Sequence, residues 1–407
     1  MSFAQGRKLA LSPKVTLALY LIAEITSRAA PFLLIPYFSR LLGATGFGEL
    51  SLYYGNIVLF SALFSLSLDV TCAQYFYKKG ERKISNLIYI SQAYYLLLFF
   101  FSIILLIFNV NSFTLAFTTS VSLSFYMLLL IQKQARKYVL QYILCQLSYS
   151  LLFVVLSCSL IYYFKSYISV AIAQLMAYSI LILIISNKEM ISMTRATSFR
   201  YYKYIISFGG PLIFHKSSVY IRDGLERYFV FLFFSSYTLG VFFAAKQLAL
   251  IILVLITVIN RALSPYIMES LKNNKLTSQM LASIFSFLIL LFLIIYYALY
   301  VFITPEVMGF IFGDDYSDSY KYVPQVVLGA LLYLPYTISV NILYFHKKVK
   351  SISLVTFCIS LLHVGYVYYF SLEVDLLFMS YSTVISNSLI SLCIFFIASK
   401  TLKDQVQ

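Results

Sequence analysis

The chain has 407 residues, of which 61% are hydrophobic and 11% are charged, whereas about 25% of the residues of a typical soluble domain are charged. The 30 Lys and Arg residues outnumber the 15 Asp and Glu residues and give a formal net charge of +15. This composition indicates an integral membrane protein without a large soluble catalytic domain. It also argues against nucleic acid as a partner, because the basic residues fall between apolar runs.

Apolar runs long enough to cross a membrane as helices recur along the whole chain, and they are too long and too uniformly apolar for β-barrel strands. The first run holds Glu24 and Arg28 and lacks a small-residue cleavage site, so we interpret it as a membrane helix and not as a signal peptide. The sequence predicts an all-α, polytopic integral membrane protein with about twelve transmembrane helices. They are expected at residues 15–37, 47–76, 84–108, 113–131, 138–164 and 167–186, and then at 204–234, 238–265, 277–303, 322–345, 351–370 and 375–398.

The connections between these runs alternate in charge. Counted along the chain, 21 Lys and Arg residues fall on one side of the membrane and three (Arg40, Lys165 and Lys321) on the other. Short cytoplasmic connections collect basic residues, so both termini are expected in the cytoplasm. Attraction of these loops to anionic membrane lipids explains most of the net charge without any substrate.

The long charged connection at residues 187–203 divides the runs into two sets of six, predicted as an N-terminal half at 1–190 and a C-terminal half at 200–407. The opening helix of each half is interrupted, by Pro31 in the first and by Gly209, Gly210 and Pro211 in the second. Matching interruptions in two halves point to the binding site of a transporter, with hinges at these residues and alternating access by rocking of the halves. Two unrelated proline kinks are the alternative.

Several segments resemble one family of transporters. They are PFLLIPYFSRLLGATGFGEL at residues 31–50, FGGPLIFHKSSVYIRDGLERYFV at 208–230, LGVF at 239–242, RALSPY at 261–266 and FIFGDDY at 310–316. In this order they are similar to the Wzx-type O-antigen flippases, the polysaccharide transporter family within the MOP superfamily, which also contains the MATE transporters. Glu226 stands where that family more often has Asp, and Phe242 stands where Tyr is frequent.

The resemblance implies a flippase that moves an undecaprenyl-diphosphate-linked oligosaccharide from the cytoplasmic to the periplasmic leaflet of the bacterial inner membrane during O-antigen or similar surface polysaccharide synthesis. It further implies a polysaccharide polymerase and a chain-length regulator as partners, and neither a cofactor nor a catalytic residue. The five cysteines lie in apolar runs away from histidine, so no metal site is indicated.

Charged residues inside the apolar runs are the candidate functional residues, because a charge at this depth normally faces a partner or a wet cavity. Guanidinium and ammonium groups suit a diphosphate, so the expected substrate-binding residues are Arg28, Lys216, Lys246, Arg222 and Arg227. The acidic residues that could form a gate or couple an ion are Glu24, Asp69, Asp223 and Glu226.

The same charged residues could instead have purely structural roles. Glu24 and Arg28 are four residues apart and could neutralise each other, and Arg222, Asp223, Glu226 and Arg227 could close a network along their own helix. Asp69 could pair with the basic residues that follow it.

Two other functions stay open as well. A MATE-type drug or cation antiporter would be expected to hold acidic groups in its cavity. Here the apolar runs contain six basic residues but only four acidic ones. A membrane enzyme, such as a polysaccharide polymerase or an acyltransferase, would need a large outer loop or a histidine with a matching acid. His215, His346 and His363 have no such acid near them in the sequence.

Overall fold

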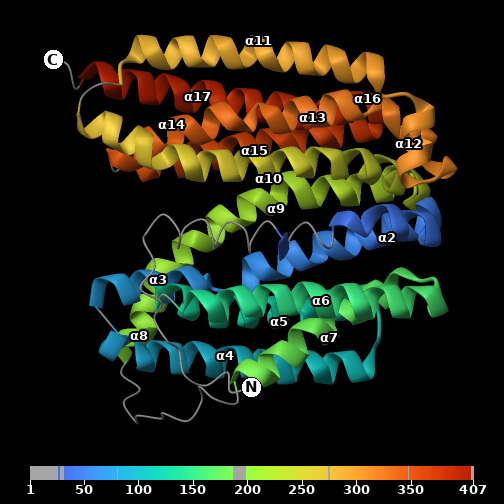
Figure 1. Ribbon diagram of the computed structural model, residues 1–407, viewed down its shortest axis with the longest axis vertical. Helices are drawn as coiled ribbons and strands as arrows, with labels where there is room; N and C mark the ends of the chain where they lie inside the picture. Colours follow the sequence, from blue (N-terminus) through green and yellow to red (C-terminus); the bar gives the residue numbers. More distant parts are fainter. Residues whose placement is uncertain are drawn as a thin grey trace. The chain divides into compact units, whose positions relative to one another are not determined.

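The computed structural model describes residues 26–27, 32–79, 81–136, 138–186, 199–273, 276–346 and 348–404. Throughout these residues the regular structure is helical, and no strand is formed. The predicted all-α class is therefore confirmed, and Figure 1 shows the helices in chain order.

Ten helices in the described part of the chain are long and apolar enough to cross a membrane. They correspond to ten of the twelve expected spans. The expected span at 15–37 lies largely outside the described residues. The expected span at 204–234 is helical, but its four charged residues at positions 222–227 lower its hydropathy below that of a simple membrane span. The chain is thus a multi-pass membrane protein.

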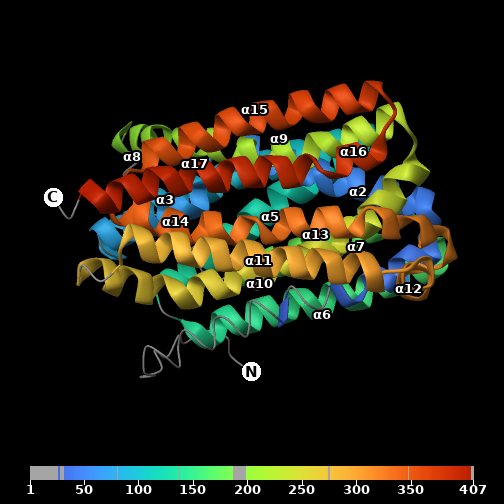
Figure 2. The same ribbon diagram turned by 90° about the horizontal axis from the view of Figure 1, so that it is seen from above.

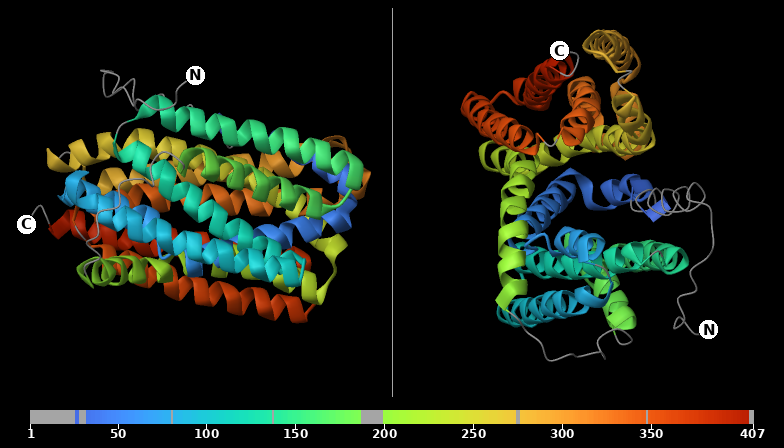
Figure 3. Two further views of the ribbon diagram at one scale, coloured as in Figure 1. Left: turned by 90° about the horizontal axis from the view of Figure 1, so that it is seen from below. Right: turned by 90° about the vertical axis from the view of Figure 1, so that its left-hand side faces the viewer.

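The chain folds into two compact units. The N-terminal unit comprises residues 1–42 and 52–220, and the C-terminal unit comprises residues 43–51 and 221–407. The division therefore falls within helix α9 (Gly210–Phe233), midway through the expected span at 204–234 and not at the sequence division at 190–200. Gly43, at φ 63° and ψ 174°, interrupts helix α2 (Ile35–Phe64) where the chain passes into the C-terminal unit. Figure 3 shows the helices lengthwise and end-on.

In the N-terminal unit, α5 is the central helix, and 78% of its most apolar 18-residue stretch is buried. It packs against α3, α4, α6 and α7, and Tyr95, Phe125, Tyr126 and Tyr178 belong to their shared core. Besides most of α2, the unit contains α3 (Leu68–Lys79), α4 (Glu81–Phe108), α5 (Ser112–Ala135), α6 (Val139–Phe164), α7 (Tyr167–Ser186), α8 (Phe199–Tyr204), the π-helical turn η1 (Ile205–Gly209) and the start of α9.

Two irregular backbone segments meet inside the N-terminal unit. Between α2 and α3, Leu66 and Ser67 adopt left-handed conformations at φ 46° and 48°, which non-glycine residues rarely do. Tyr95 on α4 donates a 2.8 Å hydrogen bond to the Ser65 carbonyl of this break. Opposite lies η1, whose last residue is Gly209; a Cβ atom there would come within 2.4 Å of the Leu66 carbonyl oxygen.

The π-helical turn has a cause in the sequence. Pro211 follows it and has no N–H to donate to a carbonyl one turn earlier, so the helix widens by one residue before the proline. The expected interruption of this helix is thus a π-helical turn that packs against a second break. Whether it acts as a hinge stays a prediction.

In the C-terminal unit, the span formed by α13 and α14 is central, with 72% of its most apolar stretch buried. It packs against α10, α11 and α17, and Figure 2 shows these helices side by side. The unit contains α10 (Ser236–Lys272), α11 (Ser278–Phe302), α12 (Pro305–Phe312), the 3-10 helix η2 (Asp314–Lys321), α13 (Val323–Leu331), α14 (Tyr333–Phe345), α15 (Val349–Leu372), α16 (Leu376–Ser380) and α17 (Ser382–Asp404), together with most of α9.

A close crossing of two backbones joins residues 43–51 to α10 within the C-terminal unit. A Cβ atom on Gly48 would lie 2.0 Å from the Ser236 carbonyl oxygen, and one on Gly240 would lie 1.8 Å from the Ala44 carbonyl oxygen. Small residues four apart on both segments therefore let the backbones touch, as in other membrane helix pairs.

Candidate functional site

An ion pair between two helices lies at the centre of the candidate site in the C-terminal unit. Glu226 on α9 has a fully buried side chain, and the side chain of Lys246 on α10 is 13% exposed. The ammonium group of Lys246 donates to Oε2 of Glu226. Oε1 of the same carboxylate accepts from the Ser382 hydroxyl at 3.2 Å. A buried carboxylate needs such partners, because leaving it uncompensated costs several kcal/mol.

Arg222, one helical turn before Glu226, has a different environment. Its guanidinium donates a 3.3 Å hydrogen bond to Oδ1 of Asn387. The amide of Asn387 is held in that orientation by its own donation to the Gly329 carbonyl at 2.8 Å, at the end of α13. Within the described residues, Arg222 forms no ion pair, and its Nε is buried without a hydrogen-bond partner. Arg222 is therefore a half-buried cation that donates its hydrogen bond to a neutral group.

The two other charges of this helix turn lie apart from the pair. Asp223 is exposed. Arg227 donates a 2.8 Å hydrogen bond to the Ser51 carbonyl, and its guanidinium lies 5.0 Å from the centre of the Phe243 ring. Arg227 is thus positioned to hold residues 43–51 against α9 and α10. The ion pair that the structure shows for Glu226 runs between helices and not along α9.

His363 on α15 joins this site, although its sequence neighbourhood gave no reason to select it. It is 3% exposed, and its Nδ1 lies 2.9 Å from the Ser386 hydroxyl and 3.3 Å from the Ser382 carbonyl. Ser382 also binds Glu226. No acid lies near His363 in the sequence, but Ser382 links it to Glu226 of α9, 137 positions earlier. Only the packing of α15, α17 and α9 reveals it.

Of the candidate residues in the N-terminal unit, the structure describes only some. Asp69 is half-buried in the first turn of α3, where the helix dipole favours a carboxylate. Glu24, Arg28 and Pro31 lie outside the described residues. The backbone of α9 is described at Pro211 and Lys216, but their side chains are not. Of the expected hinge glycines, Gly209 allows the contact with Leu66, whereas a Cβ on Gly210 would meet nothing within 4 Å.

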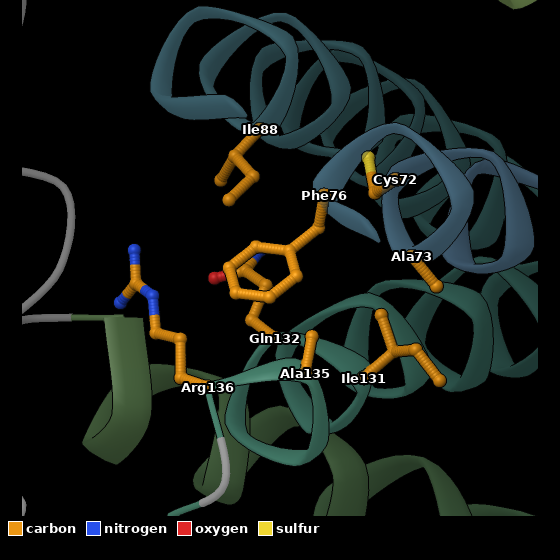
Figure 4. Close-up of a pocket in the computed structure, with 8 residues that line it drawn as sticks. All are labelled: Cys72, Ala73, Phe76, Ile88, Ile131, Gln132, Ala135 and Arg136. Carbon is orange, nitrogen blue, oxygen red and sulfur yellow. The ribbon is translucent and has the colours of Figure 1, made fainter. Parts of the chain in front are cut away.

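A small pocket lies where α3, α4 and α5 meet in the N-terminal unit (Figure 4). Its cavity volume is about 10 Å³, which is room for about one water molecule. Phe76 and Ile88 face Gln132 across it, and Arg136 stands at its edge. None of the charged residues expected at the binding site lines this pocket. Its lining residues are Cys72, Ala73, Phe76, Ile88, Ile131, Gln132, Ala135 and Arg136.

No group of three or more potential metal ligands occurs among the residues that the structure describes. The charged and hydrogen-bonding groups of the site are instead those of Glu226, Lys246, Arg222 and His363, with the hydroxyl groups of α17.

Comparisons with known proteins agree with this architecture. Residues 16–271 match the model of the polysaccharide biosynthesis protein family. A Haemophilus influenzae protein named for the Lsg locus is 30% identical over 405 residues, which cover 95% of this chain and 98% of that protein. The chain belongs to the polysaccharide biosynthesis protein family. A second Haemophilus influenzae protein, an uncharacterized membrane protein, is 31% identical over 361 residues, covering 86% of this chain and 88% of the relative.

Solved structures show which fold this family member has. A MOP superfamily transporter from Pyrococcus furiosus, described as having a binding pocket of reverse polarity, matches with a TM-score of 0.66 at 14% identity over 100% of both chains. The inward-facing conformation of a multidrug resistance MATE family transporter of the same superfamily also matches with a TM-score of 0.66, at 15% identity over 91% of this chain and 95% of that one. The fold is therefore that of the MOP superfamily, as the sequence resemblance implied.

Proposed function

We propose that this protein is a flippase that moves an undecaprenyl-diphosphate-linked oligosaccharide, an O-antigen or similar repeat unit, from the cytoplasmic to the periplasmic leaflet by alternating access. It would act in the bacterial inner membrane with both termini in the cytoplasm. Its product would pass to a polysaccharide polymerase and a chain-length regulator. Family membership supports a role in polysaccharide synthesis, and the fold supports transport.

The observation that carries the proposal is the hydrogen bonding of the Arg222 guanidinium. A cation within a membrane helix is costly unless a partner or water compensates it, and among the described residues the hydrogen-bond partner of the Arg222 guanidinium is the neutral amide of Asn387. Its remaining donors suit the oxygens of a diphosphate, which a guanidinium binds in a bidentate manner. Lys246, held by Glu226, supplies a second positive charge in the same unit.

The MATE-type antiporter is the alternative, and the structural neighbours are compatible with it. An exchanger of cationic drugs would be expected to present an accessible carboxylate. Glu226 does not meet this expectation, because it is fully buried and already bound by Lys246 and Ser382. The exposed Asp223 is the carboxylate on α9 that an antiporter would use.

Deletion of the gene from its native host, with complementation from a plasmid, tests the proposal. Deletion should abolish the surface polysaccharide and cause lipid-linked units to accumulate. Complementation with wild type should restore export, whereas Arg222→Gln should not, at equal protein abundance. Lys321→Gln is the matched control, because Lys321 is an exposed cation that binds Asp318 at 2.6 Å. If the surface glycan is unchanged after deletion and sensitivity to cationic drugs increases, the antiporter function replaces the flippase function.

A further inference from the structure

The tautomer of His363 follows from its hydrogen bonds. The Ser386 hydroxyl donates its proton to the Ser382 carbonyl, one turn earlier on α17. The two groups near Nδ1 of His363 are that hydroxyl oxygen and that carbonyl. With this hydroxyl orientation both groups accept, so we assign the proton to Nδ1. In the neutral imidazole, Nε2 is left as an acceptor, and it is buried without a hydrogen-bond partner among the described residues.

Four charged groups act electrostatically on this histidine. The groups that act on it electrostatically are Arg222, Asp223 and Glu226 of α9 and Lys246 of α10. The other helices packed against α15 add little charge: α14 and α16 carry no charged residue, and those of α17 lie near its far end, from Lys400 onward. Tyr366 is the titratable residue where α16 meets α15, and it donates to the Phe378 carbonyl.

The three central groups lie at a similar depth. His363 is nine residues before the end of α15, Glu226 seven before the end of α9, and Lys246 ten after the start of α10. At about 1.5 Å per residue, each is roughly 10–15 Å from the helix end that the charge rule assigns to the outside. The groups are therefore remote from bulk water and interact more strongly than they would at a surface.

The charges of this cluster balance while His363 is neutral. Arg222 and Lys246 contribute two positive charges, and Asp223 and Glu226 contribute two negative charges. A proton on Nε2 would leave one positive charge in excess at a buried position, which is unfavourable by itself. An anion that binds to the Arg222 guanidinium, or draws Lys246 away from Glu226, would remove this excess.

We propose that His363 binds a proton at Nε2 when the C-terminal unit binds an anionic group, so that the proton and the anion stabilise each other. The proposal rests on the proposed function, because it takes the diphosphate of the lipid-linked saccharide as the anion. A proton from water adds to the Nε2 lone pair, no other bond is broken, and Glu226 gains an imidazolium beside it as Lys246 turns to the anion. Linkage is reciprocal: the anion raises the affinity for the proton as much as the proton raises the affinity for the anion.

Calorimetric titration of the full-length protein in lipid nanodiscs tests this linkage, with geranylgeranyl diphosphate as the probe. Comparing buffers of different ionisation heat gives the number of protons taken up on binding. Wild type should take up more protons than His363→Asn, whose amide keeps a donor near the position of Nδ1 but has no counterpart of Nε2. His346→Asn, a histidine at the end of α14 and outside the site, should behave like wild type.

The pH dependence has a defined sign. Protonation of the probe itself weakens binding as the pH falls, and this effect is shared by all variants. Where His363 is neutral in the free protein, the linked proton makes wild type bind more tightly at lower pH, by up to tenfold per pH unit relative to His363→Asn. Equal proton uptake by the two proteins would overturn the proposal and leave the flippase intact. If wild type does not bind the probe at all, the proposed function itself fails.

A measurement on wild type alone avoids the risk that the variant misfolds. The chain has three histidines, so nitrogen NMR of protein labelled at histidine can follow each ring, with His346→Asn used for assignment. At a fixed pH, adding the probe should convert His363 from the neutral form protonated at Nδ1 to the imidazolium. A ring that stays neutral when the probe is saturating contradicts the proposal.

Discussion

At the scale of residues, the buried ion pair of Glu226 and Lys246 differs from the exposed ion pair of Asp318 and Lys321 in its expected contribution to stability. The side chains of the exposed pair are 73% and 49% accessible, and such pairs contribute at most about 1 kcal/mol. The carboxylate of Glu226 is fully buried, so removing Lys246 leaves a buried charge without its ion-pair partner.

Lys246→Met is therefore expected to lower the free energy of unfolding by about 3–5 kcal/mol. The double variant Glu226→Gln with Lys246→Met should recover much of that loss, because no unpaired charge remains. Unfolding of the protein in detergent measures both, and Asp318→Asn, expected to change stability by at most about 1 kcal/mol, is the matched control. Equal losses for the single and the double variant would show that the pair does not couple.

Some residue assignments could be made from the sequence and others could not. A charge inside an apolar run is visible in any sequence, so Arg222, Glu226 and Lys246 could be selected as candidates. Their partners could not, because Asn387, Ser382 and His363 lie more than 100 positions away and are brought near only by packing. His363 was missed because the apolar run around it offers no acid within a helical turn.

At the scale of elements, the structure gives a physical reason for two of the motifs that resemble the transporter family. Phe47-Gly48 and Leu239-Gly240 belong to the segments that resemble the polysaccharide transporters, and the structure places these two glycines where backbones touch. The spacing predicted helices but did not show that these glycines pair. The break at Leu66 and Ser67 was not predicted either, since neither residue is a glycine or a proline; the Tyr95 hydroxyl that binds its Ser65 carbonyl comes from another helix.

Gly240→Ala tests the crossing. The added Cβ would lie 1.8 Å from the Ala44 carbonyl oxygen, so the segments must separate, and overpacking of this kind costs about 1–3 kcal/mol. Gly365→Ala on α15 is the control, because its Cβ would meet nothing within 4 Å; it should be neutral or more stable by about 0.5–1 kcal/mol. Thermal unfolding of both variants measures this difference in stability. Equal stability for the two would contradict the close crossing.

At the scale of the whole molecule, the excess of basic residues on one set of connections predicts the topology. The ten candidate spans follow from hydropathy alone, and the seventh span is helical despite its four charges at positions 222–227. The boundary between the compact units did not, because it depends on contacts of α9 and of residues 43–51 and not on the length of a connection.

Reporter fusions test the orientation. A fluorescent protein that matures only in the cytoplasm should be active when fused at residue 407 and inactive when inserted in the loop at Asp318, which is exposed. Alkaline phosphatase, which folds in the periplasm, should give the opposite pattern. The reverse result at both positions would place the termini outside and overturn the charge argument.

The central claim is that the protein moves a lipid-linked, diphosphate-bearing saccharide between leaflets. The most direct measurement is translocation by purified protein in liposomes that carry a fluorescent polyprenyl-diphosphate monosaccharide in both leaflets. A membrane-impermeant reductant should bleach only the outer-leaflet probe in empty vesicles and in vesicles with Arg222→Gln, but nearly all of the probe in vesicles with wild type. Bleaching by wild type that stops at the outer leaflet would contradict the account.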